Sequence, residues 1–77
     1  MDIREDFARN LRKLRQQKGL SQEALAHEAG IDRTYISALE RGVYSASLTM
    51  VEKLAKVLGV EPAILLQRAA RSQRTKR

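Results

Sequence analysis

The segment from Leu20 to Gly42 constrains the fold of this chain more than any other. Ser21 and Asp32 are residue types whose side chains cap helix N-termini, and each precedes an amphipathic run. Gly30 and Gly42 follow these runs, where glycine readily adopts the left-handed conformation that ends a helix. The spacing predicts two short helices joined by a turn too tight for anything but a fixed, near-perpendicular crossing. Six apolar residues would form the inner surface of this unit: Leu25, Ala26, Ala29, Ile31, Ile36 and Leu39.

The second of these helices carries short or basic side chains opposite its apolar side. The helical period places Ile36 and Leu39 together facing the core, which leaves an outer face made of Arg33, Thr34, Ser37, Ala38 and Arg41. By itself, such a face is most often simply solvated. Beside a tight turn it favours a recognition helix, whose N-terminal end enters the DNA major groove. In that groove Arg bonds guanine bidentately, and Thr or Ser reaches base edges or a thymine methyl group.

The stretch from Ser21 to Gly42 resembles the helix-turn-helix of lambda-repressor-like and Cro-type bacterial regulators. The likeness rests on a Gln that opens the first helix, a Gly in the turn, and the Tyr-Ile-Ser and Glu-Arg-Gly sequences of the second helix. With the flanking helices it covers about residues 3–67. It implies an all-α, compact five-helix domain with the helix-turn-helix at its second and third helices. The short chain is also similar in size to the controller proteins of restriction–modification systems.

The resemblance assigns roles to residues of this sequence. It implies that Gln22 bonds the DNA backbone and that four residues face bases: Arg33, Thr34, Ser37 and Ala38. Ala38 departs from the longer polar residue often found at its position, which limits it to apolar contact. We also expect three residues near the recognition helix to contact the DNA backbone: Tyr35, Arg41 and Tyr44.

The helices on either side of this unit are predicted from their capping residues and their apolar faces. A first helix from about Ile3 to Lys18 would begin under Asp2, and a fourth, capped by Ser47, would end at Gly59. We expect the inward apolar residues of the first to be Ile3, Phe7, Leu11 and Leu14, and of the fourth to be Leu48, Val51, Leu54, Ala55 and Leu58. The basic residues of the first helix would lie on its solvated surface, or less often contact phosphates: Arg9, Arg12, Lys13, Arg15 and Lys18.

The last two helices have more apolar surface than one core needs. Met50 and Val57 lie opposite Leu48, and the fifth helix begins at Pro62 and carries Ile64, Leu65 and Leu66 in succession. Three consecutive apolar residues cannot all face one core. We therefore predict a homodimer whose interface includes Met50, Val57, Pro62 and Ile64, with Leu65 in the core. The alternative is an isolated exposed apolar residue, which needs no explanation.

Composition agrees with one small DNA-binding domain. The 77 residues carry a net charge of +6 and no cysteine, which suits a polyanionic partner and excludes disulfides. Charge alone does not separate nucleic acid from an anionic membrane surface, but no stretch approaches the roughly 20 apolar residues of a membrane span. We expect a domain at residues 1–70, a basic tail at residues 71–77 and a cytoplasmic location. The tail would be disordered, add phosphate contacts or extend the fifth helix.

No catalytic or metal-binding constellation is evident, so we expect neither an enzyme nor a cofactor. His27, the single histidine, should be exposed, and Asp32 and Glu40 are explained by helix capping and surface charge. The sequence thus predicts a homodimeric, sequence-specific transcription regulator that binds double-stranded DNA at a pseudo-palindromic operator. Two alternatives stay open: an antitoxin-type regulator that also binds a partner protein, and a protein that coats nucleic acid through charge alone.

Overall fold

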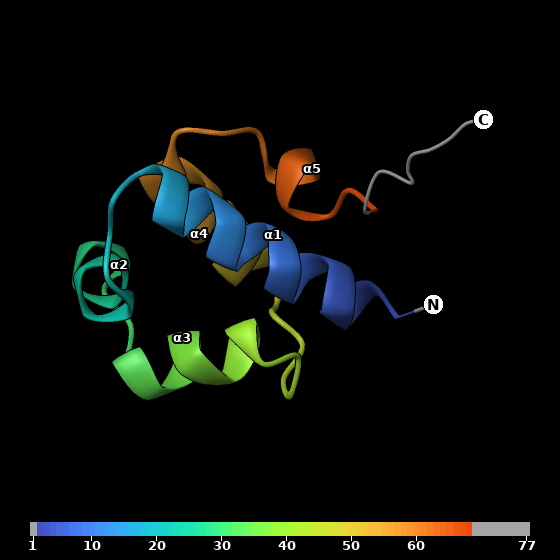
Figure 1. The fold of residues 1–77 in the computed structure, drawn as a ribbon, viewed down its shortest axis with the longest axis horizontal. Helices are drawn as coiled ribbons and strands as arrows, with labels where there is room; N and C mark the ends of the chain where they lie inside the picture. The colour runs from blue at the N-terminus through green and yellow to red at the C-terminus, as the bar shows by residue number, and fades with distance from the viewer. Residues whose placement is uncertain (1, 69–77) are drawn as a thin grey trace.

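The computed structural model describes residues 2–68 of the chain. This part folds into five helices and contains no strand: α1 Ile3–Gln17, α2 Gln22–Ala29, α3 Arg33–Glu40, α4 Leu48–Leu58 and α5 Pro62–Leu65. Helix α3 runs along one side of the domain against α1 and α2, and α2 lies at the end opposite the N-terminus (Figure 1). The expected all-α, five-helix fold is confirmed. The proposed basic tail lies outside the described residues.

The first four helices begin under the expected capping side chains. The carboxylates of Asp2 and Asp32 accept from the backbone N–H groups two residues ahead, at 2.9 and 2.7 Å. The hydroxyls of Ser21 and Ser47 accept from the N–H groups three residues ahead, at 2.9 and 3.1 Å. Each bond satisfies a donor that the first helical turn leaves unpaired, which explains why the helices start there.

The core is assembled from all five helices. Its largest fully buried side chains are Leu11, Leu25, Ile36, Leu39, Leu54 and Leu65. Five of the six apolar residues expected inside the helix-turn-helix are buried, and Ile31 packs against them half-buried. The turn therefore joins two helices that share one apolar surface, and this holds α3 at a fixed crossing with α2.

Two expected core residues are exposed. Ile3 is 59% exposed and Leu48 is 85% exposed, so their assignment to inward-facing stripes was wrong. Each is the first residue of its helix, and both line a surface groove beside the core residues Phe7 and Val51. The helical period identifies the face of a residue, but it does not show how far along that face the core reaches.

The single turn of α5 is fastened to α1. The side-chain amide of Asn10 donates to the backbone carbonyls of Leu65 and Gln67, at 2.9 and 2.7 Å. These carbonyls belong to the end of α5 and the residues after it, where no further helical turn would satisfy them. Leu65 is fully buried, as expected, and the two bonds keep it in the core.

Candidate nucleic-acid interface

The turn between α2 and α3 is built by backbone geometry. Gly30 ends α2 in the left-handed conformation, with φ of 72°, and the N–H of Ile31 donates to the carbonyl of Ala26 at 2.9 Å. Asp32 then caps α3. Only three residues separate the helices, which leaves the crossing little freedom.

The N-terminal half of α3 presents a polar face to solvent. Arg33 and Thr34 are exposed and Ser37 is half-buried. Asp32 is held at the start of this face by the backbone and side-chain groups of Thr34, whose hydrogen bonds lower the pKa of the Asp32 carboxyl below its ordinary value of 3.8. The cap is therefore ionised near neutral pH. This half of the helix has the exposure that insertion into a groove requires.

The C-terminal half of α3 is enclosed by the rest of the domain. Ala38, Leu39 and Glu40 are consecutive, and all three are buried. Ala38 is 3% exposed, so its assignment as a base-facing residue was wrong. Consecutive residues point in different directions around a helix, so burial of all three means that the last turn is covered on most sides. Only the first turns of α3 are free to approach DNA.

Three predicted backbone-contacting residues lie on α3 or in the segment directly after it. Tyr35 is half-buried against the core, and its ring lies 6.1 Å from that of Tyr44, measured between centroids, at an interplanar angle of 46°. Tyr44 is 55% exposed in the loop after α3. The guanidinium of Arg41 is exposed and donates to the carbonyl of Ser37 at 3.4 Å. The tyrosine pair thus connects the recognition helix to the α3–α4 loop.

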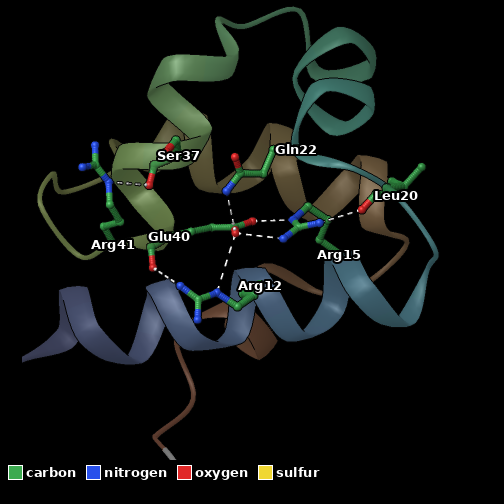
Figure 2. A network of polar contacts seen from close by, with 7 residues as sticks. All are labelled: Arg12, Arg15, Leu20, Gln22, Ser37, Glu40 and Arg41. Carbon is green, nitrogen blue, oxygen red and sulfur yellow. Dashed lines mark hydrogen bonds and ion pairs between the residues drawn. The ribbon is translucent and has the colours of Figure 1, made fainter.

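Glu40 forms a buried polar network that we did not expect. Its side chain is 1% exposed, so its interpretation as a surface charge was wrong. Arg15 donates to both carboxylate oxygens, through Nε at 2.6 Å and Nη2 at 3.1 Å, and to the carbonyl of Leu20 at 2.7 Å (Figure 2). Arg12 donates to the backbone carbonyl of Glu40 at 3.2 Å. Two arginines of α1 therefore meet the last residue of α3.

The fourth member of the network is Gln22, which we assigned to the DNA backbone. Its side-chain Nε2 donates to Oε1 of Glu40 at 3.1 Å, and the residue is half-buried at the start of α2 (Figure 2). The expectation that Arg15 belongs to the solvated face of α1 was also wrong, because its side chain is 12% exposed. A signal was present: Glu40 and Arg15 each lie four residues after a core residue, Ile36 and Leu11, and so share its helix face.

The residues predicted for a dimer interface have different surroundings. Met50 and Val57 are half-buried and pack against the core of their own chain, so the premise that they have no intrachain partner was wrong. Pro62 is exposed and Ile64 is half-buried on α5. An apolar groove of about 150 Å³ lies elsewhere, and its lining includes Ile3, Phe7, Tyr44, Leu48, Val51 and Leu66.

Metal-binding groups and membrane-spanning helices are absent from residues 2–68. His27 is exposed, and residues 2–68 hold no group of three His, Cys, Asp or Glu side chains that could bind a metal ion. None of the helices described is long and apolar enough to cross a membrane. The candidate site is therefore the exposed first half of α3, which follows the tight α2–α3 turn, together with the buried charge network of Glu40 at the other end of α3.

Comparison with known proteins identifies relatives of this arrangement. A family model described as helix-turn-helix matches residues 11–65. The chain is 48% identical over 65 residues to a hypothetical transcription factor of Neisseria meningitidis, covering 84% of this chain and 61% of that protein. It is 47% identical over 66 residues to the control protein C.BamHI of Bacillus amyloliquefaciens, covering 84% and 82% of the two chains.

A solved structure extends the comparison to a DNA complex. The restriction–modification controller protein C.Esp1396I, crystallised as a tetramer with its natural 35 base-pair operator, superposes with a TM-score of 0.76. Its sequence is 31% identical, and the match covers 84% of this chain and 86% of that one.

Proposed function

This chain belongs to the helix-turn-helix family, and from that premise we propose that it is a sequence-specific DNA-binding transcription regulator that acts as a homodimer. The observation that carries the proposal is the exposed first half of α3, which Gly30 and a shared apolar surface hold at a fixed angle to α2. The operator complex of C.Esp1396I supports it, because that protein has the same fold over most of both chains. The net charge of +6 suits a DNA partner.

The base contacts are assigned to the exposed side chains of α3. Arg33 would bond guanine O6 and N7, and Thr34 and Ser37 would reach neighbouring base edges or a thymine methyl group. Ala38 has no such role because it is buried. The DNA backbone contacts are assigned to Gln22, Tyr35, Arg41 and Tyr44, which belong to the start of α2, to α3 and to the residues directly after α3.

The dimer follows from the need to place two recognition helices on one operator. We keep Pro62 and Ile64 of α5 in the proposed interface and add the apolar groove, whose lining includes Leu48 and, directly after α5, Leu66. We assign a second copy of the chain to this groove, because a two-fold axis beside the groove would bury the same apolar surface from both subunits.

The similarity to C.BamHI and C.Esp1396I supports control of a restriction–modification operon as the regulatory setting, with the protein acting in the cytoplasm. An antitoxin-type regulator would instead co-purify with a toxin encoded beside it. A protein that coats nucleic acid through charge would bind random and selected duplexes with similar affinity.

The test is a selection from randomised duplex DNA followed by competition binding with Arg33→Ala. We expect one enriched operator sequence, and we expect Arg33→Ala to lose about 1–3 kcal/mol of specific affinity and to relax discrimination at one base pair. Lys53→Ala on α4 removes the same charge from another exposed position and should leave the ranking of operator variants unchanged. If Arg33→Ala also leaves that ranking unchanged, Arg33 is not a base reader. Recovery of no enriched sequence would favour the charge-driven alternative.

A further inference from the structure

The carboxylate of Glu40 faces a side chain that the proposed function places on DNA. It accepts from Nε2 of Gln22 at 3.1 Å while Arg15 occupies both of its oxygens, at 2.6 and 3.1 Å. Nε of Arg12 lies 3.8 Å from Oε1. The network therefore joins the last residue of α3 to α1 and to the first residue of α2.

The chemistry of this contact determines how the amide of Gln22 is oriented. A carboxylate only accepts hydrogen bonds, so it must face the nitrogen of the amide and not its oxygen. One N–H of Nε2 is then used by Glu40, and the second N–H stays available as a donor. Phosphate oxygens also accept hydrogen bonds. If the amide were flipped by half a turn, its carbonyl oxygen would face the phosphate, and two acceptors form no hydrogen bond. Glu40 thus selects the orientation that a phosphate requires.

The position of Glu40 suits this role better than a direct role in DNA binding. Its side chain is 1% exposed and itself anionic, so it does not bind a phosphate. Arg12 and Arg15 supply two positive charges for its one negative charge, so the network does not repel an approaching phosphate. Arg15 also bonds the carbonyl of Leu20 at 2.7 Å, which fixes the chain two residues before Gln22.

We propose that Glu40 is a positioning residue that, through its contact with Nε2 of Gln22, holds the side-chain amide of Gln22 ready to donate to a DNA phosphate. This inference rests on the proposed function, because it takes Gln22 as a contact to the DNA backbone. Glu40 fixes a side chain that would otherwise sample many rotamers. Since a phosphate contact carries no sequence information, Glu40 should raise the affinity for all DNA sequences and leave the choice of bases unchanged.

The test is a double-mutant cycle of Glu40→Gln and Gln22→Ala, with affinity measured on the selected operator and on a random duplex. In Glu40→Gln one acceptor oxygen becomes an NH₂ group, so Arg15 keeps the remaining oxygen and Gln22 faces a donor. We expect Glu40→Gln to weaken binding to both duplexes by roughly three- to tenfold, the scale of one rotamer-rich side chain losing its orientation. In the Gln22→Ala background, Glu40→Gln should cause no further loss.

A second variant that removes one negative charge serves as a control, and its expected effect on DNA affinity is the opposite. Loss of a negative charge ordinarily strengthens binding to DNA, so Glu28→Gln on the exposed surface of α2 should leave affinity unchanged or raise it. A weakening by Glu40→Gln therefore does not arise from the charge change itself. Equal losses with and without Gln22 would overturn the proposal and leave Glu40 a structural residue. Where Glu40→Gln is unfolded, Glu40→Asp replaces it in the cycle, since it keeps a charge for Arg15 but shortens the reach to Gln22.

Nuclear magnetic resonance of the free protein separates this inference from the proposed function. The two side-chain N–H signals of Gln22 should be resolved from each other, and the one bonded to Glu40 should exchange slowly with solvent; in Glu40→Asp this protection should be lost. Solvent-exposed signals in the wild type would overturn the inference even if the operator is bound. Protected signals in a wild-type protein that selects no operator would refute the proposed function, and with it the role of Glu40 toward DNA.

Discussion

The buried pair of Arg15 and Glu40 makes a strong prediction for stability. The Arg15 side chain is 12% exposed and that of Glu40 is 1% exposed, and their closest atoms are 2.6 Å apart. In Glu40→Leu the guanidinium of Arg15 loses both carboxylate bonds and keeps only the carbonyl of Leu20. Removal of one member of a buried pair costs about 3–5 kcal/mol. A core of this size rarely supplies more than about 3–5 kcal/mol in total, so we expect the variant to be largely unfolded.

Urea denaturation followed by far-UV circular dichroism measures this loss. In the double variant Arg15→Met, Glu40→Leu no charge is left without a partner, and its stability should return to within about 2 kcal/mol of the wild type. Arg4→Ala is the control, because the pair of Arg4 and Asp2 is exposed and solvent screens it, so its loss should leave the urea midpoint nearly unchanged. If Glu40→Leu costs less than about 1 kcal/mol, Arg15 escapes to solvent and the network does not stabilise the domain.

Two further predictions concern the cap of α3 and the dimer. The pKa of Asp32 is lowered in the folded protein, so its contribution to stability is present above the ordinary value of 3.8 and is lost as pH falls through the lowered pKa. Asn at this position still caps the helix but does not titrate, so thermal melts should show that Asp32→Asn loses less stability on acidification than the wild type. Equal losses of stability would show that the cap is not linked to acid unfolding. Ile64→Asp and Leu48→Asp should each give monomers in sedimentation, whereas Lys53→Asp should remain dimeric, and a dimer mass for both apolar variants would exclude the proposed interface.

Helix boundaries could be predicted from the sequence because their causes are local. Ser21 and Asp32 bond donors two or three residues away, and Gly30 ends α2 through its own backbone conformation. Neither effect depends on the rest of the chain. Burial of Leu25 and Ile36 also followed from the sequence, since the helical period places them on the shared inner face.

The remaining features depend on what neighbouring elements cover. The helical period placed Leu48 on the inward face of α4, but this first residue of the helix is 85% exposed. It placed Ala38 on the outer face of α3, where the rest of the domain encloses the last turn. Glu40 was taken for a surface residue because of its charge, although it shares a face with Ile36, and only the tertiary structure brings Arg15 to it. The dimer interface belongs to this class as well, since a partner chain would define it.

The central claim is that two recognition helices related by a two-fold axis read two half-sites of one operator. Both helices enter the major groove on one face of the duplex only when the half-site centres lie about 34 Å apart, roughly one helical turn, or a multiple of it. The decisive measurement is a footprint on the selected operator with and without about five added base pairs, half a turn, between its halves. The account predicts a symmetric footprint and loss of cooperative binding upon insertion. A single asymmetric half-site that is protected equally on both duplexes would contradict it and identify a monomeric binder.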